Sequence, residues 1–349
     1  MSILDVGTLG SAWHRRVGAA WPRVLVAFIR RTALITLGAA ASARAQEPAG
    51  LPPHFPINPN TAERSGVFSA PYRAPHQGWL TSLLFDYASV VENQYATGHS
   101  TTKRYLTDAE VMRTEVNLSR DVSATTFLEA QLGVHGAYDG WFDTWINWAH
   151  RRLGQVYRAR TNRPINVYGD TLRLPGVGLI TRRKTNAAFN DLRLSVGRRY
   201  GEHLQSVLSI TLPTSTGPGG YGRGVVSLNA VHTLHVQLLR RFTLEGTAGV
   251  GYTPKHGRLT LYQRDLFASG TAGAIWRFWG TQSSYVNFFY HSPYYHGTTF
   301  GGLDNYELSL DFGWLRRLAR GREWRVGFTE DPRREDPAVD LVFMFGASW

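Results

Sequence analysis

Cysteine is absent from this chain of 349 residues, and so is any run of about 20 consecutive apolar residues. The missing run excludes a bundle of transmembrane helices, because a helix needs roughly 20 apolar residues to cross a bilayer. The missing cysteine leaves no disulfide to hold the fold and fits an oxidising envelope compartment, where free thiols are a liability. Acidic residues are few, 26 against 38 basic ones, which gives a net charge of +12. The chain instead has 13% aromatic residues and 36 glycines, an unusual balance for a cytosolic enzyme.

The N-terminal stretch has the pattern of an export signal. An apolar run, 32–43, follows Arg30-Arg31 and leads into the small-x-small sequence Ala43-Arg44-Ala45, which is typical of a signal-peptidase site. We expect residues 1–45 to be a cleaved signal peptide, with an N-terminal anchor helix as the alternative. Residues 46–77 contain seven prolines and no periodicity, so they cannot form a paired strand or a long helix. This Pro-rich N-terminal segment is expected to be an extended lead-in.

Residues 78–349 alternate apolar and polar side chains, the period of a β-strand with two different faces. Long and short connections separate the strands in turn, and the strand number is even, as in outer-membrane barrels. The pattern predicts an all-β fold, a closed transmembrane antiparallel β-barrel of about 12 strands in the bacterial outer membrane. In such a barrel, the pore is one location that the Pro-rich segment could occupy. The alternative is a soluble sandwich or lipocalin-like barrel, which the strand lengths and the aromatic residues near strand ends disfavour. The predicted strands are 78–91, 106–120, 124–137, 188–200, 203–213, 225–240, 242–254, 260–279, 281–291, 303–315, 322–330 and 339–349.

The last predicted strand carries an apolar residue at every second position and ends on Trp349. A terminal strand of this kind resembles the sorting signal that the barrel-assembly machinery reads, with Phe345 and Trp349 as its anchors. We expect the machinery to bind this strand by edge-to-edge pairing before the barrel closes.

Four stretches, 105–122, 136–154, 189–200 and 326–346, resemble an uncharacterised family of Gram-negative outer-membrane proteins, the domain-of-unknown-function family 3187. The resemblance implies an outer-membrane location and a barrel. It implies no activity.

Charged residues on the polar parity of the strands are expected to face the lumen. The opposite orientation would place five arginines in hydrocarbon, at up to about 2–4 kcal/mol each near the midplane. Their mixed sign does not favour selectivity from a ring of one charge, so they either pair across a closed lumen or line a hydrated pore. The pore-lining candidates are Arg113, Glu115, Glu129, Arg193, Glu245, Glu307, Asp311 and Arg325, and Asp86, Asp191, Arg199, Arg277, Glu323 and Asp340 share their parity.

The second external loop, 138–187, is far longer than a connection needs, which favours a function for it. Trp141, Trp145 and Trp148 have helical spacing, so we expect a short amphipathic helix with Asp139 as N-cap. It could lie on the membrane surface, fold into the barrel mouth or pack on neighbouring loops. The loop has a net charge of +6, and its arginines are candidates for binding lipopolysaccharide phosphates or an anionic solute. They are Arg151, Arg152, Arg158, Arg160, Arg163, Arg182 and Arg183.

These features favour a porin-like or gated channel for small solutes over a closed structural or surface-binding barrel. A lipid-modifying enzyme is a third reading, because His291 and Ser292 adjoin near a strand end, but no third group orients them. We therefore expect no enzyme activity, no cofactor and no metal site. The expected partners are outer-membrane lipids, lipopolysaccharide and the barrel-assembly machinery, and the location makes nucleic acid improbable as a partner.

Overall fold

The computed structural model describes residues 64–65, 69–95, 104–152, 164–217, 222–318, 322–331 and 341–349. All of them belong to the compact unit Glu47–Trp349. The expected signal peptide, 1–45, lies outside the described residues. None of the described helices is long and apolar enough to cross a membrane.

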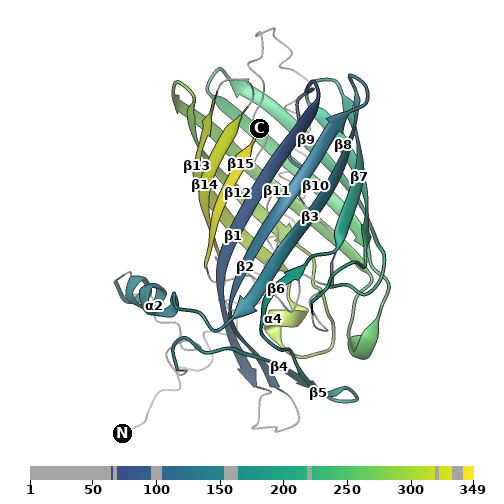
Figure 1. The fold of residues 1–349 in the computed structure, drawn as a ribbon, viewed down its shortest axis with the longest axis vertical. Helices are drawn as coiled ribbons and strands as arrows, with labels where there is room; N and C mark the ends of the chain where they lie inside the picture. The colour runs from purple at the N-terminus through teal and green to yellow at the C-terminus, as the bar shows by residue number, and fades with distance from the viewer. Residues whose placement is uncertain are drawn as a thin grey trace, which may run out of the picture. The chain divides into compact units, whose positions relative to one another are not determined.

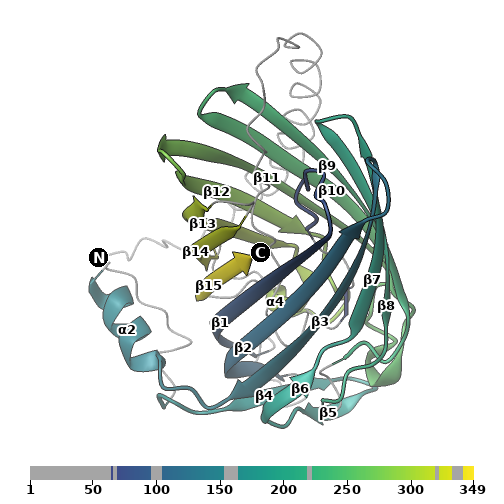
Figure 2. The ribbon, with the colours of Figure 1, turned by 45° about the horizontal axis from the view of Figure 1, so that its top comes forward.

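Twelve strands of the described part of the chain form one closed antiparallel ring (Figures 1 and 2). Each strand pairs with the next along the barrel, and the last pairs with the first, with Ser82 opposite Ser348. Closure leaves no strand edge unpaired, which is the condition for a sheet in lipid. The ring strands are β1 (Trp79–Tyr95), β2 (Arg104–Asp121), β3 (Thr126–Tyr138), β7 (Leu192–Tyr200), β8 (Leu204–Leu212), β9 (Ser227–Leu239), β10 (Phe242–Tyr252), β11 (Leu266–Trp279), β12 (Gln282–His291), β13 (Glu307–Arg317), β14 (Glu323–Glu330) and β15 (Leu341–Ser348).

The two ends of the barrel differ as the alternation of connections predicts. One end, the turn end, carries the short connections 122–125, 201–203, 240–241, 280–281 and 318–322, together with the start of β1 and the C-terminus. The other, the loop end, carries the long connections. The alternation and the twelve predicted strands are confirmed.

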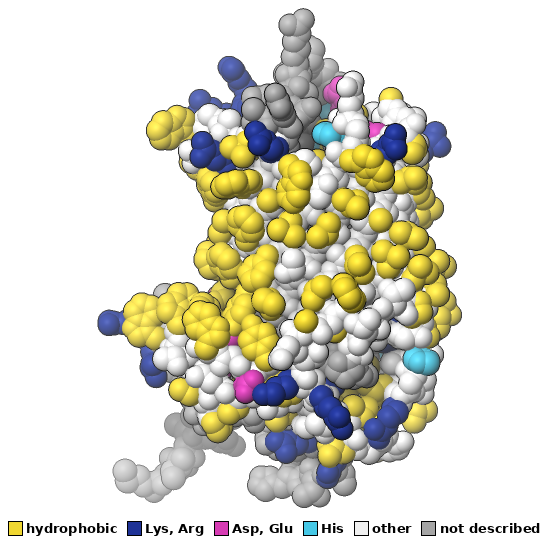
Figure 3. Space-filling view, in the orientation of Figure 1, with side chains coloured by type: hydrophobic (Ala, Val, Ile, Leu, Met, Phe, Trp, Pro, Cys, Tyr) yellow, Lys and Arg dark blue, Asp and Glu magenta, His cyan; other side chains and the backbone are white. Residues whose placement is uncertain are grey.

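The outward face of the barrel is apolar and the inward face is polar, which confirms the predicted orientation. Leu208, Val250 and Phe288 are 58%, 61% and 50% exposed on the outside, whereas the inward Asp86 and Glu245 are each 3% exposed. In Figure 3 hydrophobic side chains cover the visible barrel wall, and charged ones gather toward its ends.

The long loops hold elements that the sequence pattern did not predict. β4 (Gly169–Leu174) and β5 (Gly178–Thr181) form a hairpin that pairs with β2 beyond the ring. β6 (Thr185–Phe189) pairs with β3 just before β7 does. The helical turn η1 (Gly257–Leu259) runs into a turn region over residues 260–265, and α4 (Gly301–Asp304) overlaps the start of the strand predicted over 303–315. The strands predicted to start at 260 and 303 therefore start at Leu266 and Glu307.

The predicted helix of the second loop exists as α2 (Asp143–Arg152). It starts later than expected, so the prediction of Asp139 as its N-cap is wrong. The Asp139 carboxylate forms an exposed ion pair with Lys184 instead, at 3.1 Å.

Candidate functional site

A segment of the chain that is not part of any strand lies inside the barrel. Residues 64–65 and 69–77 are here called the luminal segment. They contact inward-facing residues of β2, β3, β7, β8, β9 and β12. The segment begins near the loop end and reaches the turn end, where β1 starts. The expectation that the Pro-rich segment lies in the pore holds for these residues, and 46–63 and 66–68 lie outside the described residues.

The loop end of the luminal segment is held by Arg64 and Ser65. The Arg64 guanidinium is buried and donates to the carbonyl oxygens of Thr253 at 2.5 Å, Pro254 at 2.8 Å and Arg264 at 2.8 Å. Backbone carbonyls can satisfy a buried guanidinium because all five of its N–H groups are donors. The Ser65 hydroxyl forms a hydrogen bond with the Nε2 atom of His291, 2.7 Å away.

His291 is in turn held by its neighbours on the wall. Its ring stacks on that of Tyr294, with centroids 4.1 Å apart. The Tyr294 hydroxyl donates to the carboxylate of Glu307 at 2.5 Å. The pore-lining candidate Glu307 is 1% exposed and supports, through Tyr294, the His291 ring that binds Ser65.

The middle of the luminal segment is held by polar side chains of β8 and β9. The Gln205 side chain accepts from the backbone N–H of Arg73 at 2.9 Å and donates to the carbonyl of Pro71 at 3.1 Å. The Tyr72 ring stacks on His235, with centroids 5.1 Å apart. Wall side chains thus replace the strand partners that the prolines of this segment exclude.

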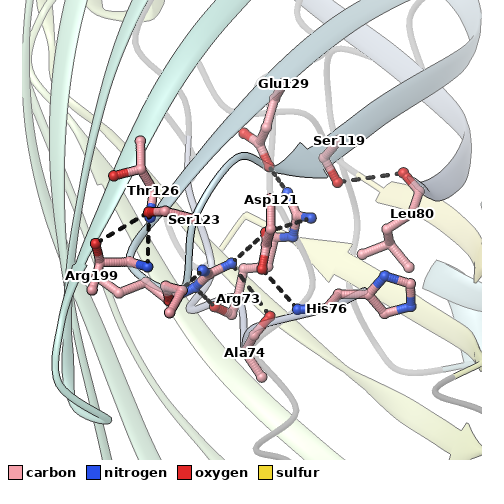
Figure 4. A network of polar contacts seen from close by, with 12 residues as sticks. Arg73, Ala74, His76, Leu80, Ser119, Asp121, Ser123, Thr126, Glu129 and Arg199 are labelled. Carbon is pink, nitrogen blue, oxygen red and sulfur yellow. Dashed lines mark hydrogen bonds and ion pairs between the residues drawn. The ribbon is translucent and has the colours of Figure 1, made fainter. Parts of the chain in front are cut away.

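An ion-pair network, here called the latch, holds the turn end of the segment (Figure 4). It consists of Arg73 of the segment, Asp121 at the end of β2 and Arg199 of β7. The Asp121 carboxylate accepts from Arg199 at 2.8 Å and lies 3.1 Å from the Arg73 guanidinium. It also accepts the backbone N–H of His76 at 2.8 Å. Arg199 further donates to the carbonyl of Arg73 at 2.6 Å.

The latch packs against a buried aromatic ring, that of Phe127. The guanidiniums of Arg73 and Arg199 both lie over the ring of Phe127, at 4.9 and 4.8 Å from its centroid. Cation–π contacts of this kind gain strength when water is excluded. Gly197 of β7 faces the ring, and a Cβ atom at this position would overlap with it. The pore-lining candidate Glu129 lies 3.7 Å from Arg73 and belongs to the same end of the lumen.

The other candidates for the pore lining also pair with neighbours on the wall. Arg113 binds Asp86 through two nitrogens, at 2.6 and 3.0 Å. Glu245 binds His235 at 2.7 Å. Arg193 faces inward on β7, opposite Gln131 and Thr211, and Asp340 lies outside the described residues. The remaining contacts are Gln131 to Glu115 at 2.8 Å, Thr329 to Asp311, Arg325 to Glu323 at 3.3 Å and Arg223 to Asp191 at 3.2 Å.

The basic residues of the second loop are not all available to an external anion. Arg151, Arg152 and Arg183 are exposed. Arg182 is 9% exposed and lies 3.7 Å from the carboxylate of Asp170 in the β4–β5 hairpin, so its assignment to an external anion site is wrong. Burial outweighs this guanidinium and raises the pKa of Asp170 to about 6. Arg158, Arg160 and Arg163 lie outside the described residues.

The geometry does not support hydrolysis at His291 and Ser292. The Nδ1 atom of His291 lies 2.5 Å from the Ser292 carbonyl oxygen, and its Nε2 atom binds Ser65. The Ser292 hydroxyl accepts the backbone N–H of Ala268 at 3.0 Å. Among the described residues no group of three or more His, Asp or Glu side chains could hold a metal ion.

The C-terminal residues close the ring. The backbone of Trp349 exchanges two hydrogen bonds with Thr81, at 2.9 and 3.0 Å. The Trp349 side chain is 54% exposed, and Phe345 lies opposite Phe85 of β1 and Val326 of β14. Their predicted part in assembly remains a prediction.

The sequence matches no protein-family model and no curated protein, so the resemblance to the domain-of-unknown-function family 3187 stays a prediction. Among solved structures the chain is similar to an outer membrane channel from Pseudomonas putida F1, at 11% identity over 79% of this chain and 97% of that one, with a TM-score of 0.51. The fold is that of an outer-membrane β-barrel. A toluene transporter from Ralstonia pickettii (9% identity, 78% and 88% covered, TM-score 0.37) and the NanC porin (7% identity, 77% and 98% covered, TM-score 0.42) match too distantly to add to this.

Proposed function

We propose that this protein is a porin-like channel of the bacterial outer membrane whose luminal segment closes the pore to small solutes. The observation that carries the proposal is how that segment is held. None of residues 64–65 and 69–77 takes part in a strand, and the contacts described above join it to the wall through side chains. The segment can therefore leave the lumen without breaking the backbone ladder of the barrel.

The outward surface supports the membrane location. Tryptophans near the turn end are strongly exposed, at 61% for Trp79, 55% for Trp276, 52% for Trp324 and 54% for Trp349. Aromatic side chains at this position are typical of the girdle at a membrane–water interface. The wall between them and the loop end is apolar on the outside, as lipid requires.

The charges of the lumen wall favour small solutes without selection for one sign of charge. Its carboxylates and guanidiniums neutralise one another in pairs such as Asp86 with Arg113 and Asp191 with Arg223. A wall of paired charges gives no field of one sign, so we expect weak ion selectivity. We propose transport rather than catalysis, because the inward polar groups described above bind one another or the luminal segment.

Single-channel recordings in planar bilayers test the proposal. Asp121→Asn weakens the latch and should lengthen or enlarge the step currents relative to the wild type. Asp139→Asn makes the same chemical change in an exposed ion pair outside the lumen and should leave the currents unchanged. A double variant, Arg64→Ala with Arg73→Ala, releases both ends of the segment. If the wild type and all variants insert but give no step currents, the channel is refuted and the closed structural barrel takes its place.

A further inference from the structure

Helix α2 is fastened to the outside of the barrel by a buried carboxylate. Glu110 lies on β2, opposite Ser89 and Tyr138, on the outward parity of that strand. A carboxylate facing lipid is destabilising, yet Glu110 is only 1% exposed. It accepts the backbone N–H of Phe142 at 2.6 Å, just before the first residue of α2. An anion in this position also interacts favourably with the helix dipole.

Two neighbouring residues, Tyr87 and Gly140, also favour the contact between Glu110 and the start of α2. The Tyr87 hydroxyl donates to the same carboxylate. A Cβ atom at Gly140 would overlap with the Glu110 side chain, so only glycine allows the chain to pass this close. The helix is therefore seated on β1 and β2, outside the lumen, as Figure 1 shows. This excludes α2 as a plug in the barrel mouth.

The two faces of α2 differ in exposure. Ile146 is fully buried, at 0% exposed. On the outer side Trp145 and Trp148 are 46% and 50% exposed, and Trp141, two residues before the helix, is 69% exposed. Trp145 and Trp148 of α2, together with Trp141 just before it, form an exposed apolar surface that requires a partner.

The aromatic surface of α2 continues the outward face of the barrel. Tyr87 of β1 contacts Trp141 and Phe142, with ring centroids 6.4 and 5.7 Å apart, and Phe142 stacks on Trp145 at 4.8 Å. Figure 3 shows hydrophobic side chains running from the barrel wall onto the helix. A partner that covers the helix must therefore also cover the adjoining wall.

The height of α2 on the barrel matches a membrane boundary. β1 advances by about ten residues from Trp79 to Ser89, the residue opposite Glu110. At a rise of about 3.3 Å per residue and a tilt of about 40°, this is about 25 Å, the height of the apolar band of such barrels. The start of α2 thus lies about 25 Å along the barrel from the tryptophans of the turn end, which is the height of the apolar band.

We propose that α2 lies in the headgroup layer of the outer leaflet, with Trp141, Trp145 and Trp148 inserted at the acyl boundary. The exposed Arg151 and Arg152 at its C-terminal end then bind the anionic phosphates of the lipid. This proposal rests on the membrane location proposed above. Lipid is the occupant because the tryptophan surface is continuous with the lipid-facing wall and ends in two cations.

The chain has no cysteine, so single spin labels can be placed without background. Trp145→Cys and Trp148→Cys each leave two of the three tryptophans in place. Asn147→Cys is the matched control on the same helix, Phe288→Cys marks the middle of the barrel wall, and Ser123→Cys marks water at the turn end. The labelled proteins are reconstituted into vesicles of phosphatidylcholine and phosphatidylglycerol. The measurement is the ratio of label accessibility to oxygen and to a water-soluble nickel chelate.

We expect this ratio at positions 145 and 148 to be several-fold higher than at Ser123 and at Asn147, and to lie below that at Phe288. If positions 145 and 148 match Ser123 while Phe288 reports lipid, α2 is in water and the inference is overturned, but the membrane location stands. If Phe288 also matches Ser123, the membrane location itself fails. Labels at 145 and 148 that neither reagent reaches would mean a protein covers the tryptophans, which also overturns the inference.

A second variant pair tests the seat of the helix. Glu110→Ala removes the acceptor of the Phe142 N–H and should speed tryptic cleavage after Arg151 and Arg152 in the vesicles. Glu115→Ala removes an inward carboxylate from the same strand and should leave the cleavage rate unchanged. Equal rates in both variants would show that Glu110 does not hold α2.

Discussion

The Asp121→Asn variant isolates the charge that holds the luminal segment at the turn end. The Asp121 side chain is 10% exposed and its carboxylate binds two guanidiniums and one backbone N–H. Hydrogen bonds to charged groups contribute about 1.5–3 kcal/mol each. Of the contacts of Asp121, release of the segment breaks only those with Arg73 and with the backbone N–H of His76, because Arg199 belongs to the wall. Their losses do not add fully, because Arg199 keeps its bond to the carbonyl of Arg73. We therefore expect the free energy of releasing the segment to fall by about 2–3 kcal/mol.

A decrease of this size favours the released state by about 30- to 140-fold. Ser69 is a suitable reporter, because it belongs to the segment and is 4% exposed. In a Ser69→Cys background the rate of reaction with a water-soluble maleimide measures how often the segment leaves the lumen. The rate should rise by that factor in Asp121→Asn and stay unchanged in Asp139→Asn. An unchanged rate in Asp121→Asn, in protein that retains the heat-modifiable mobility of a folded barrel, would refute the latch.

Three further predictions concern the wall, the hairpin and the C-terminus. Gly197→Ala forces the enclosed ring of Phe127 aside and should lower the free energy of unfolding by about 1–3 kcal/mol in urea titrations, whereas Gly246→Ala, whose Cβ would have ordinary contacts, should cost clearly less. Burial raises the pKa of Asp170 from 3.8 to about 6, so its contribution to the hairpin is full below about pH 3.8 and lost as the pH rises through about 6. The protection of the hairpin amides, taken as their exchange rate relative to the intrinsic rate at each pH, should therefore fall across this range, and Asp170→Asn should abolish that fall in protection. Trp349→Ser should reduce barrel assembly in cells but not refolding into detergent, and equal losses in both would assign the residue to stability alone.

The strands were predictable because their signal is local. A strand that separates two environments must alternate polarity at every residue, and this period is visible in any stretch of about ten residues. The inward position of Arg113 and Glu245 follows from the same alternation. The broken fourth strand, β6 followed by β7, was not predicted, because the interruption at 190–191 depends on pairing with β3.

The helix α2 shows where local reasoning stops. The spacing of Trp141, Trp145 and Trp148 predicts a helix, since those side chains share one face only at 3.6 residues per turn. Its start was misplaced, because the group that receives the backbone N–H of Phe142 is Glu110 on β2, remote in sequence. The sequence left open whether the helix lies inside or outside the barrel, and the contact with Glu110 decides it.

Residues 78–349 determined by themselves the closed barrel, its orientation and the alternation of loops and turns, because each depends on the polarity of neighbouring positions. Only the tertiary structure decided the long-range contacts. Asp121 binds Arg73 and Arg199. Ser65 binds His291, and Arg182 lies beside Asp170. The luminal segment has no periodicity, so its sequence does not predict which wall residues it contacts. Its place follows from the carbonyls and carboxylates that barrel closure brings to one side of it, and such long-range pairings exist only once the ring is complete.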